Sequence, residues 1–141
     1  MGLLDGRLAL VTGASRGIGY ATARVLAREG AHVIAVARTI GGLEELDDAI
    51  KKDSGQSATL VPIDLTDMPA IDRLGGAIND RWGKLDILVA NAGSLGVISP
   101  VSHVEAKVFD EVIDVNVKST WRLIRSVEPL LLKSDAGRAL V

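Results

Sequence analysis

The sequence predicts an α/β fold in which helices cover both faces of a doubly wound parallel sheet. Three observations predict it. Short apolar runs alternate with helical stripes, the runs themselves are continuous rather than alternating, and no repeat or linker divides the chain. Continuous apolar runs are typical of strands buried on both faces of a parallel sheet. At this length, residues 1–141 are expected to form one domain.

Four strands are predicted from apolar runs at residues 8–11, 33–37, 59–63 and 85–90. Between them, apolar residues recur at helical spacing within 18–26, 43–50 and 71–78, which predicts three helices. A longer helical region is predicted from about Val101 to Lys133, with a break or bend near Asn116. Residues 138–141 have the pattern of an opening fifth strand, so the sheet is expected to stop at about that strand.

The composition indicates a globular protein of the cytoplasm. Hydrophobic residues make up 48% of the chain and charged residues 24%, and there is no cysteine. A net charge of −2 without a basic cluster argues against a nucleic-acid partner, and the apolar runs are too short for a membrane span. His32 and His103 are the only histidines and neither has a second ligand at metal spacing, so no metal site is predicted.

The stretch from Thr12 to Gly19 places three glycines between the first strand and the first helix. Gly13 can make the sharp turn, Gly17 can let a pyrophosphate approach the backbone, and Gly19 can let the helix pack closely on the sheet. A helix N-terminus also attracts phosphate through its free N–H groups. The alternative is a tight turn without a ligand. The strand–turn–helix context favours a nucleotide site.

Four motifs in order resemble the short-chain dehydrogenase/reductase family. They are the glycine turn from Thr12 to Gly19, Asp64-Leu65, Asn91-Ala92-Gly93, and Asn116 within Val115-Asn116-Val117. The resemblance runs from Gly6 to Val141 and implies a Rossmann-type oxidoreductase. Such an enzyme moves a hydride between a nicotinamide cofactor and a carbonyl or alcohol substrate. The cofactor-binding residues that it implies are Gly13, Ser15, Arg16, Gly17, Ile18, Gly19, Arg38, Asp64, Leu65, Asn91, Ala92 and Gly93.

Two of these residues have a structural alternative. In the family, an acid at the position of Asp64 meets the adenine amino group, but an aspartate at a strand end also commonly makes a turn. Asn91 can either touch the ligand or bridge neighbouring strand ends. Both interpretations stay open for both residues.

The choice between nicotinamide cofactors depends on the end of the second strand. An acid there would bind the 2′-hydroxyl of NAD, whereas an arginine accommodates the 2′-phosphate of NADP. Arg38 occupies this position and no acid follows until Glu44. Arg16, in the glycine turn, can approach the same phosphate. NADP(H) is therefore favoured, with NAD as the alternative cofactor. The alternative without a ligand is that both arginines are simply solvated loop residues.

The catalytic residues that the resemblance implies are a serine, a tyrosine, a lysine four residues after the tyrosine, and an asparagine. Only Asn116 has a match. Tyr20 is the sole tyrosine, lies on the first helix, and is followed four residues later by Arg24. We therefore expect a truncated family member that holds the cofactor-binding part and is inactive alone. The alternatives are a non-catalytic NADP(H)-binding module and a folding fragment without a ligand.

One stripe near the C-terminal end of the chain predicts self-association. Its apolar residues share one helix face: Leu123, Ile124, Val127, Leu130 and Leu131. In the truncated chain this stripe is expected to be exposed beside an open strand edge, and exposed apolar stripes and open edges favour association. A homo-oligomer through the helix around Leu123–Leu131 is therefore expected.

Overall fold

The computed structural model describes residues 2–141 and confirms the doubly wound parallel sheet. Its five parallel strands lie in the order β3-β2-β1-β4-β5. Their bounds are Leu8–Thr12 for β1, His32–Ala37 for β2, Thr59–Pro62 for β3, Ile87–Val89 for β4 and Arg138–Leu140 for β5. The α-helices are α1 (Gly17–Arg28), α2 (Ile40–Ser54), α3 (Met68–Trp82), α4 (Ala106–Ile113) and α5 (Ser119–Leu131). The fifth strand that residues 138–141 predict is thus present.

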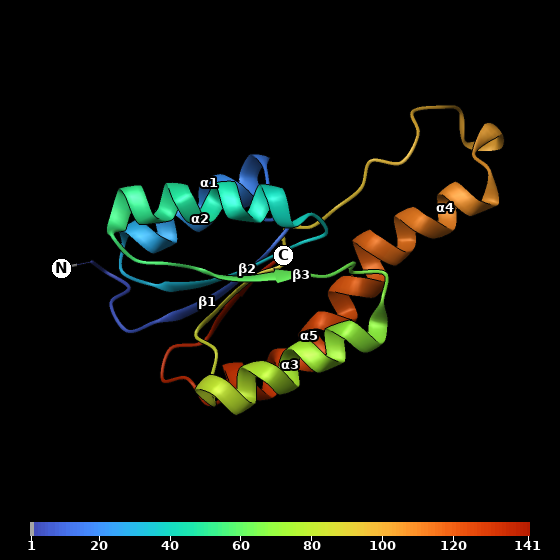
Figure 1. Cartoon of the computed structure of the whole chain (residues 1–141). Helices are drawn as coiled ribbons and strands as arrows, with labels where there is room; N and C mark the ends of the chain where they lie inside the picture. Colours follow the sequence, from blue (N-terminus) through green and yellow to red (C-terminus); the bar gives the residue numbers. More distant parts are fainter. Residues whose placement is uncertain (1) are drawn as a thin grey trace.

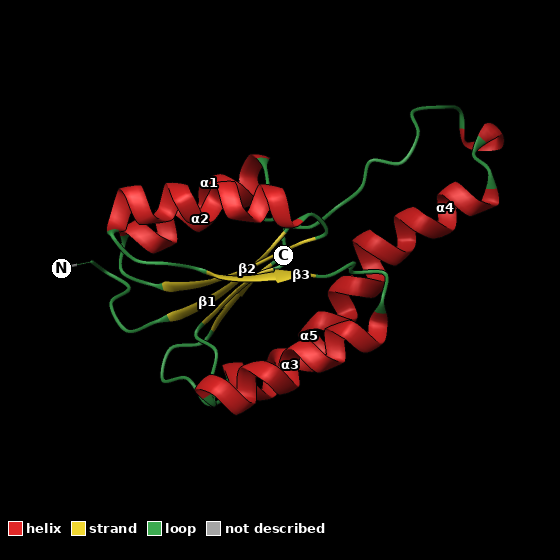
Figure 2. Cartoon of the chain, in the orientation of Figure 1, coloured by secondary structure: helices red, strands yellow, loops and turns green. Residues whose placement is uncertain are grey.

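Helices cover both faces of the sheet. Figure 1 shows α1 and α2 on one face and α3 and α5 on the other, and Figure 2 shows the strands as the layer between them. Along each strand, successive side chains enter different cores because they point to opposite faces. Leu10 packs with α3 and α5, whereas the next residue, Val11, packs with α1 and α2. This double burial is why the strands read as continuous apolar runs.

The long helical region is not one uniform helix. A short 3-10 turn, η1 (Val101–His103), comes first, and α4 then passes through a π-helical segment, η2 (Asp114–Lys118), into α5. The predicted irregularity near Asn116 is therefore this π-helix. No residue of α4 is buried, and Figure 1 shows α4 and the segment leading to it projecting away from the sheet. Within residues 2–141, no helix combines the length and the apolar content needed to cross a bilayer.

The prediction that the apolar stripe of the last helix would be exposed is wrong. Leu123, Val127 and Leu130 are at most 3% exposed and belong to the core that the sheet forms with α3. Ile124 and Leu131 are partly buried against the same core. The helix covers the face of this chain's own sheet, so the expected homo-oligomer through residues 123–131 loses the surface on which it was based.

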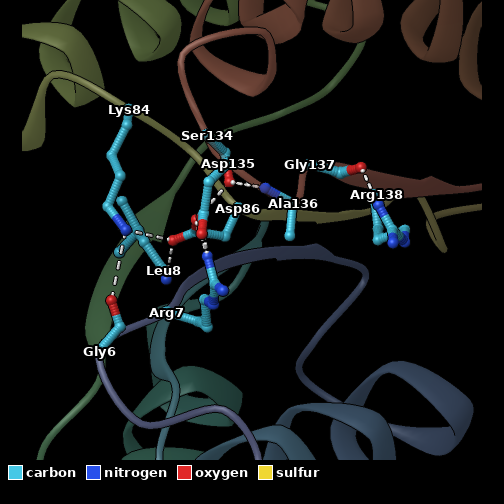
Figure 3. A network of polar contacts seen from close by, with 10 residues as sticks. All are labelled: Gly6, Arg7, Leu8, Lys84, Asp86, Ser134, Asp135, Ala136, Gly137 and Arg138. Atoms are coloured by element: carbon cyan, nitrogen blue, oxygen red, sulfur yellow. Dashed lines mark hydrogen bonds and ion pairs between the residues drawn. The ribbon is translucent and has the colours of Figure 1, made fainter.

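A buried carboxylate ties the strand beginnings together at the amino end of the sheet (Figure 3). Asp86, which is 1% exposed, accepts hydrogen bonds from the Leu8 N–H at 2.8 Å, from Lys84 at 2.6 Å and from Ser134 at 2.6 Å. Arg7 adds an ion pair at 3.2 Å. Burial alone would raise the pKa of Asp86, but these donors outweigh it and lower the pKa to about 2.

Candidate functional site

The glycine turn lies at the carboxyl end of β1. Gly13 has a φ of +62° and Gly17 a φ of +60°, a conformation that favours glycine. A Cβ on Gly13 would lie 2.9 Å from the Asn91 Nδ2, and one on Gly19 would collide with the Gly13 carbonyl. A Cβ on Gly17 would meet nothing within 4 Å. Gly13 and Gly19 are therefore required by packing, whereas the backbone at Gly17 is open to an approaching ligand.

The first turn of α1 has no protein capping group. Arg16 is the N-cap residue, its side chain makes no capping hydrogen bond, and no acid lies in the first turn. By contrast, the N-cap of α3, Asp67, accepts a hydrogen bond from the Ala70 N–H at 3.2 Å. The first N–H groups of a helix need an external acceptor when no cap supplies one. An anion placed beside Gly17 would meet these donors.

Polar groups fasten the end of β1 to the end of β4. Asn91 Nδ2 donates to the carbonyl oxygens of Thr12 and Gly13 at 3.2 and 3.3 Å. The Thr12 hydroxyl accepts the Ala92 N–H at 3.0 Å. Of the two roles left open for Asn91, the structure places the side chain in the bridging one. The bridge holds the glycine turn at the strand ends.

Arg16 and Arg38 line one pocket of about 260 Å³. Ser15 belongs to the glycine turn, Thr39 follows β2, and Gly42 lies in the first turn of α2; these three complete the lining. Both arginines are exposed, and neither forms an ion pair with another of residues 2–141. The pocket is therefore positively charged and open to an anion. A hollow of about 310 Å³ beside the start of β5 has Arg138 as its single charged lining residue.

Asp64 and Leu65 differ in what they offer a ligand. One Asp64 oxygen accepts the Thr66 N–H at 2.9 Å and the Thr66 hydroxyl at 2.8 Å. These hydrogen bonds, aided by the charge of Arg38, lower the pKa of Asp64. Asp64 therefore makes the turn of the structural alternative and remains exposed as an anion near Arg38. The Leu65 side chain is 8% exposed and packs in the core, so only its backbone can face a ligand.

Asn116 and the loop after β4 are joined. Asn116 Oδ1 accepts the Ser94 N–H at 2.6 Å, and Nδ2 donates to the Ser94 carbonyl at 2.8 Å. A Cβ on Gly93 would lie 3.5 Å from the same Oδ1. π-Helical segments occur frequently at functional sites, and here one contains Asn116, which contacts the loop after β4. Ile18 is 77% exposed beside the glycine turn and contributes an apolar surface there.

Sequence reasoning missed Thr39 and Gly42 as pocket residues. A signal was available for Gly42, because α2 begins Ile40-Gly41-Gly42 and glycine is unfavourable inside helices. Thr39 carries no such signal, since threonine is common at an N-cap and its side chain makes no capping hydrogen bond here.

A doubly wound parallel sheet with a glycine turn and an uncapped helix start at its carboxyl end is a Rossmann-like fold. The family model of the short chain dehydrogenases matches residues 7–141. The chain therefore belongs to the short-chain dehydrogenase family, as the four motifs predicted.

Known relatives are oxidoreductases that are longer than this chain. The uncharacterised oxidoreductase YciK of Escherichia coli is 38% identical over 137 residues, which is 96% of this chain and 54% of the relative. The 3-oxoacyl-[acyl-carrier-protein] reductase FabG of Vibrio harveyi is 35% identical over 97% of this chain and 54% of its own length. The chain thus spans about half the length of these curated relatives.

Solved structures of the family superpose closely on this chain. One, described as a short-chain dehydrogenase from Shigella flexneri complexed with NADP, has a TM-score of 0.93 at 37% identity, covering 97% of this chain and 58% of that one. Another, from Escherichia coli CFT073 and complexed with NADPH, has the same TM-score, identity and coverage.

Proposed function

We propose that residues 1–141 form the NADP(H)-binding part of an oxidoreductase that acts on a carbonyl or alcohol. The observation that carries the proposal is the pocket shared by Arg16 and Arg38, because neither arginine has an ion-pair partner among residues 2–141. A 2′-phosphate carries the charge that two such guanidinium groups suit. An adenosine without this phosphate has no anionic group on its ribose with which the two guanidinium groups could pair.

The remaining site residues fit the rest of a dinucleotide. The free N–H groups at the start of α1 and the open backbone at Gly17 would hold the pyrophosphate. Asp64 stays ionised near Arg38 and can accept a hydrogen bond from the adenine amino group. The relatives solved with NADP and NADPH support this arrangement, since they match 97% of this chain.

When bound, the nicotinamide would supply or accept the hydride. Asn116 fixes the loop after β4 through its two hydrogen bonds to Ser94. This loop would border the side of the site where a substrate enters. Tyr20 lies on α1 and is followed by Arg24, so it does not supply the tyrosine–lysine pair that the reaction needs. We therefore propose that residues 1–141 alone bind the cofactor without turnover.

The test is a calorimetric titration of the chain with NADPH and with NADH. We expect NADPH to bind more tightly. Because a hydrogen bond to a charged group is worth about 1.5–3 kcal/mol, Arg38→Ala should weaken NADPH binding about 10- to 100-fold and leave NADH binding nearly unchanged.

Arg28→Ala is the matched control. Arg28 is also exposed but lies at the last turn of α1, away from the glycine turn, so its removal should change neither affinity. Equal affinities for the two nucleotides, unaffected by Arg38→Ala, would contradict the NADP(H) assignment. A chain that binds neither nucleotide would contradict its role as a binding unit.

A further inference from the structure

We propose that Gly42 is a positioning residue that sets the preference for NADP(H) over NAD(H). The missing side chain lets the glycine turn lie directly against the first turn of α2, which keeps Arg16 and Arg38 on one pocket. The inference rests on the proposed cofactor function and adds the residue that tunes it.

The contact between Gly42 and the glycine turn leaves no room for a side chain. A Cβ on Gly42 would lie 2.7 Å from the Ser15 Cβ and 3.5 Å from the Ser15 carbonyl oxygen. The Ser15 Cβ is bonded to the backbone, so no rotation of the serine side chain moves it away. A side chain at position 42 therefore requires a shift of the backbone on one side of this contact.

The part of the glycine turn that follows Ser15 is less anchored than the start of α2. Immediately after Gly42, α2 is anchored by Leu43 and Leu46, which are both 0% exposed in the core beneath α1 and α2. The turn is fastened before Ser15 by the Ala14 N–H, which donates to the Val36 carbonyl at 3.1 Å. After Ser15, the next residues, Arg16 to Ile18, are all exposed.

Displacement of Ser15 moves Arg16, because the two are neighbours in the chain and Arg16 begins α1 in an extended conformation. Arg38 stays, since it follows the buried strand β2. The two guanidinium groups would then no longer converge on one phosphate. A nucleotide that carries the 2′-phosphate loses part of its binding, whereas one without it does not depend on this convergence.

Gly41 is a matched reference position for Gly42. It precedes Gly42 in the same helical turn, and a Cβ on it would meet nothing within 4 Å. The two positions share the helix and the residue type and differ in their approach to Ser15.

The experiment compares Gly42→Ala with Gly41→Ala by calorimetric titration of each full chain with NADPH and NADH. With one charge-assisted hydrogen bond displaced, Gly42→Ala should lower the affinity for NADPH about tenfold. Its affinity for NADH should stay within about twofold, and Gly41→Ala should change neither, since only an added clash separates the two variants. Thermal unfolding of both variants checks that they remain folded.

A double-mutant cycle with Ser15→Gly identifies the contact. Ser15→Gly removes the Cβ that the new alanine would meet, so Gly42→Ala should reduce NADPH affinity much less in the Ser15→Gly chain than in the wild type. The double variant also tests the inference if Gly42→Ala alone unfolds the chain. Adding Ser15→Gly should then restore folding, because it removes the same clash.

Two results would overturn the inference. One is an unchanged NADPH preference in Gly42→Ala when Arg38→Ala abolishes that preference. The other is an equal loss of affinity for both nucleotides in a Gly42→Ala chain that remains folded. A wild-type chain that shows no NADPH preference would instead overturn the proposed cofactor function, so the two failures are distinguishable.

Discussion

At the scale of single residues, the polar side chains of the site mainly hold backbone. Asn91 and Thr12 tie the end of β1 to the end of β4, and Asn116 uses both ends of its amide on Ser94. The sequence indicates these residues, because asparagines and threonines at strand ends stand out among apolar runs. It does not indicate their partners, since hydrogen bonds between distant segments leave no periodic signal.

We expect Asn116→Ala to loosen the loop that follows β4. The variant removes the acceptor of the Ser94 N–H and the donor to its carbonyl. Because a hydrogen bond contributes about 1 kcal/mol, exchange of the Ser94 amide hydrogen should accelerate about five- to tenfold. Nuclear magnetic resonance would measure the exchange, with the amides of β1 as an internal reference. An unchanged Ser94 rate would show that other contacts hold the loop.

At the scale of elements, the sequence predicted the strands and helices well, because strands buried on both faces are continuous apolar runs and helices repeat apolar residues at helical spacing. The partner of an apolar face has no such signature. The face of α5 that contains Leu123, Val127 and Leu130 was expected on the surface, but it packs on the sheet and α3. The side that the helix presents to solvent instead contains Trp121, which is 50% exposed.

Two leucines near the end of the chain test this orientation. Leu123 is 1% exposed and Leu132, just after α5, is 76% exposed. We expect Leu123→Ala to lower the free energy of unfolding by about 3 kcal/mol, because it leaves a cavity in the core. Leu132→Ala should change it by less than about 0.5 kcal/mol. Urea denaturation measures both, and similar losses of unfolding free energy in the two variants would contradict the packing of α5 on the sheet and α3.

At the scale of the whole molecule, the two ends of the sheet carry different sets of polar groups. The carboxyl ends of the strands present glycines, uncapped N–H groups and two arginines without ion-pair partners among residues 2–141. The amino ends are fastened by the network around Asp86 (Figure 3). The sequence predicted the location of the first set because the sheet topology places ligands there. It did not reveal the second, because Asp86 lies inside the predicted run 85–90 and its donors are scattered along the chain.

Asp86 predicts a loss of stability in acid. Its pKa is about 2 in the folded chain, below the ordinary 3.8. The ionised Asp86 therefore contributes about 2 kcal/mol to the free energy of unfolding. This contribution is complete above about pH 4 and is lost as the pH falls through 2. Urea denaturation at pH 7 and pH 2 should show Asp86→Asn much less stable than the wild type at pH 7, with the gap narrowed by about that amount at pH 2. A gap independent of pH would contradict the lowered pKa.

The separation of the two ends has a consequence for how this domain can evolve. The pocket residues Arg16, Arg38 and Gly42 lie at or near the ends of helices and strands. Other residues of these elements form the buried core. Under the proposed cofactor function, a few substitutions at these positions would exchange one nicotinamide cofactor for the other and leave the buried core unchanged. The Asp86 network lies at the opposite, amino end of the sheet, so such substitutions would leave its hydrogen bonds in place.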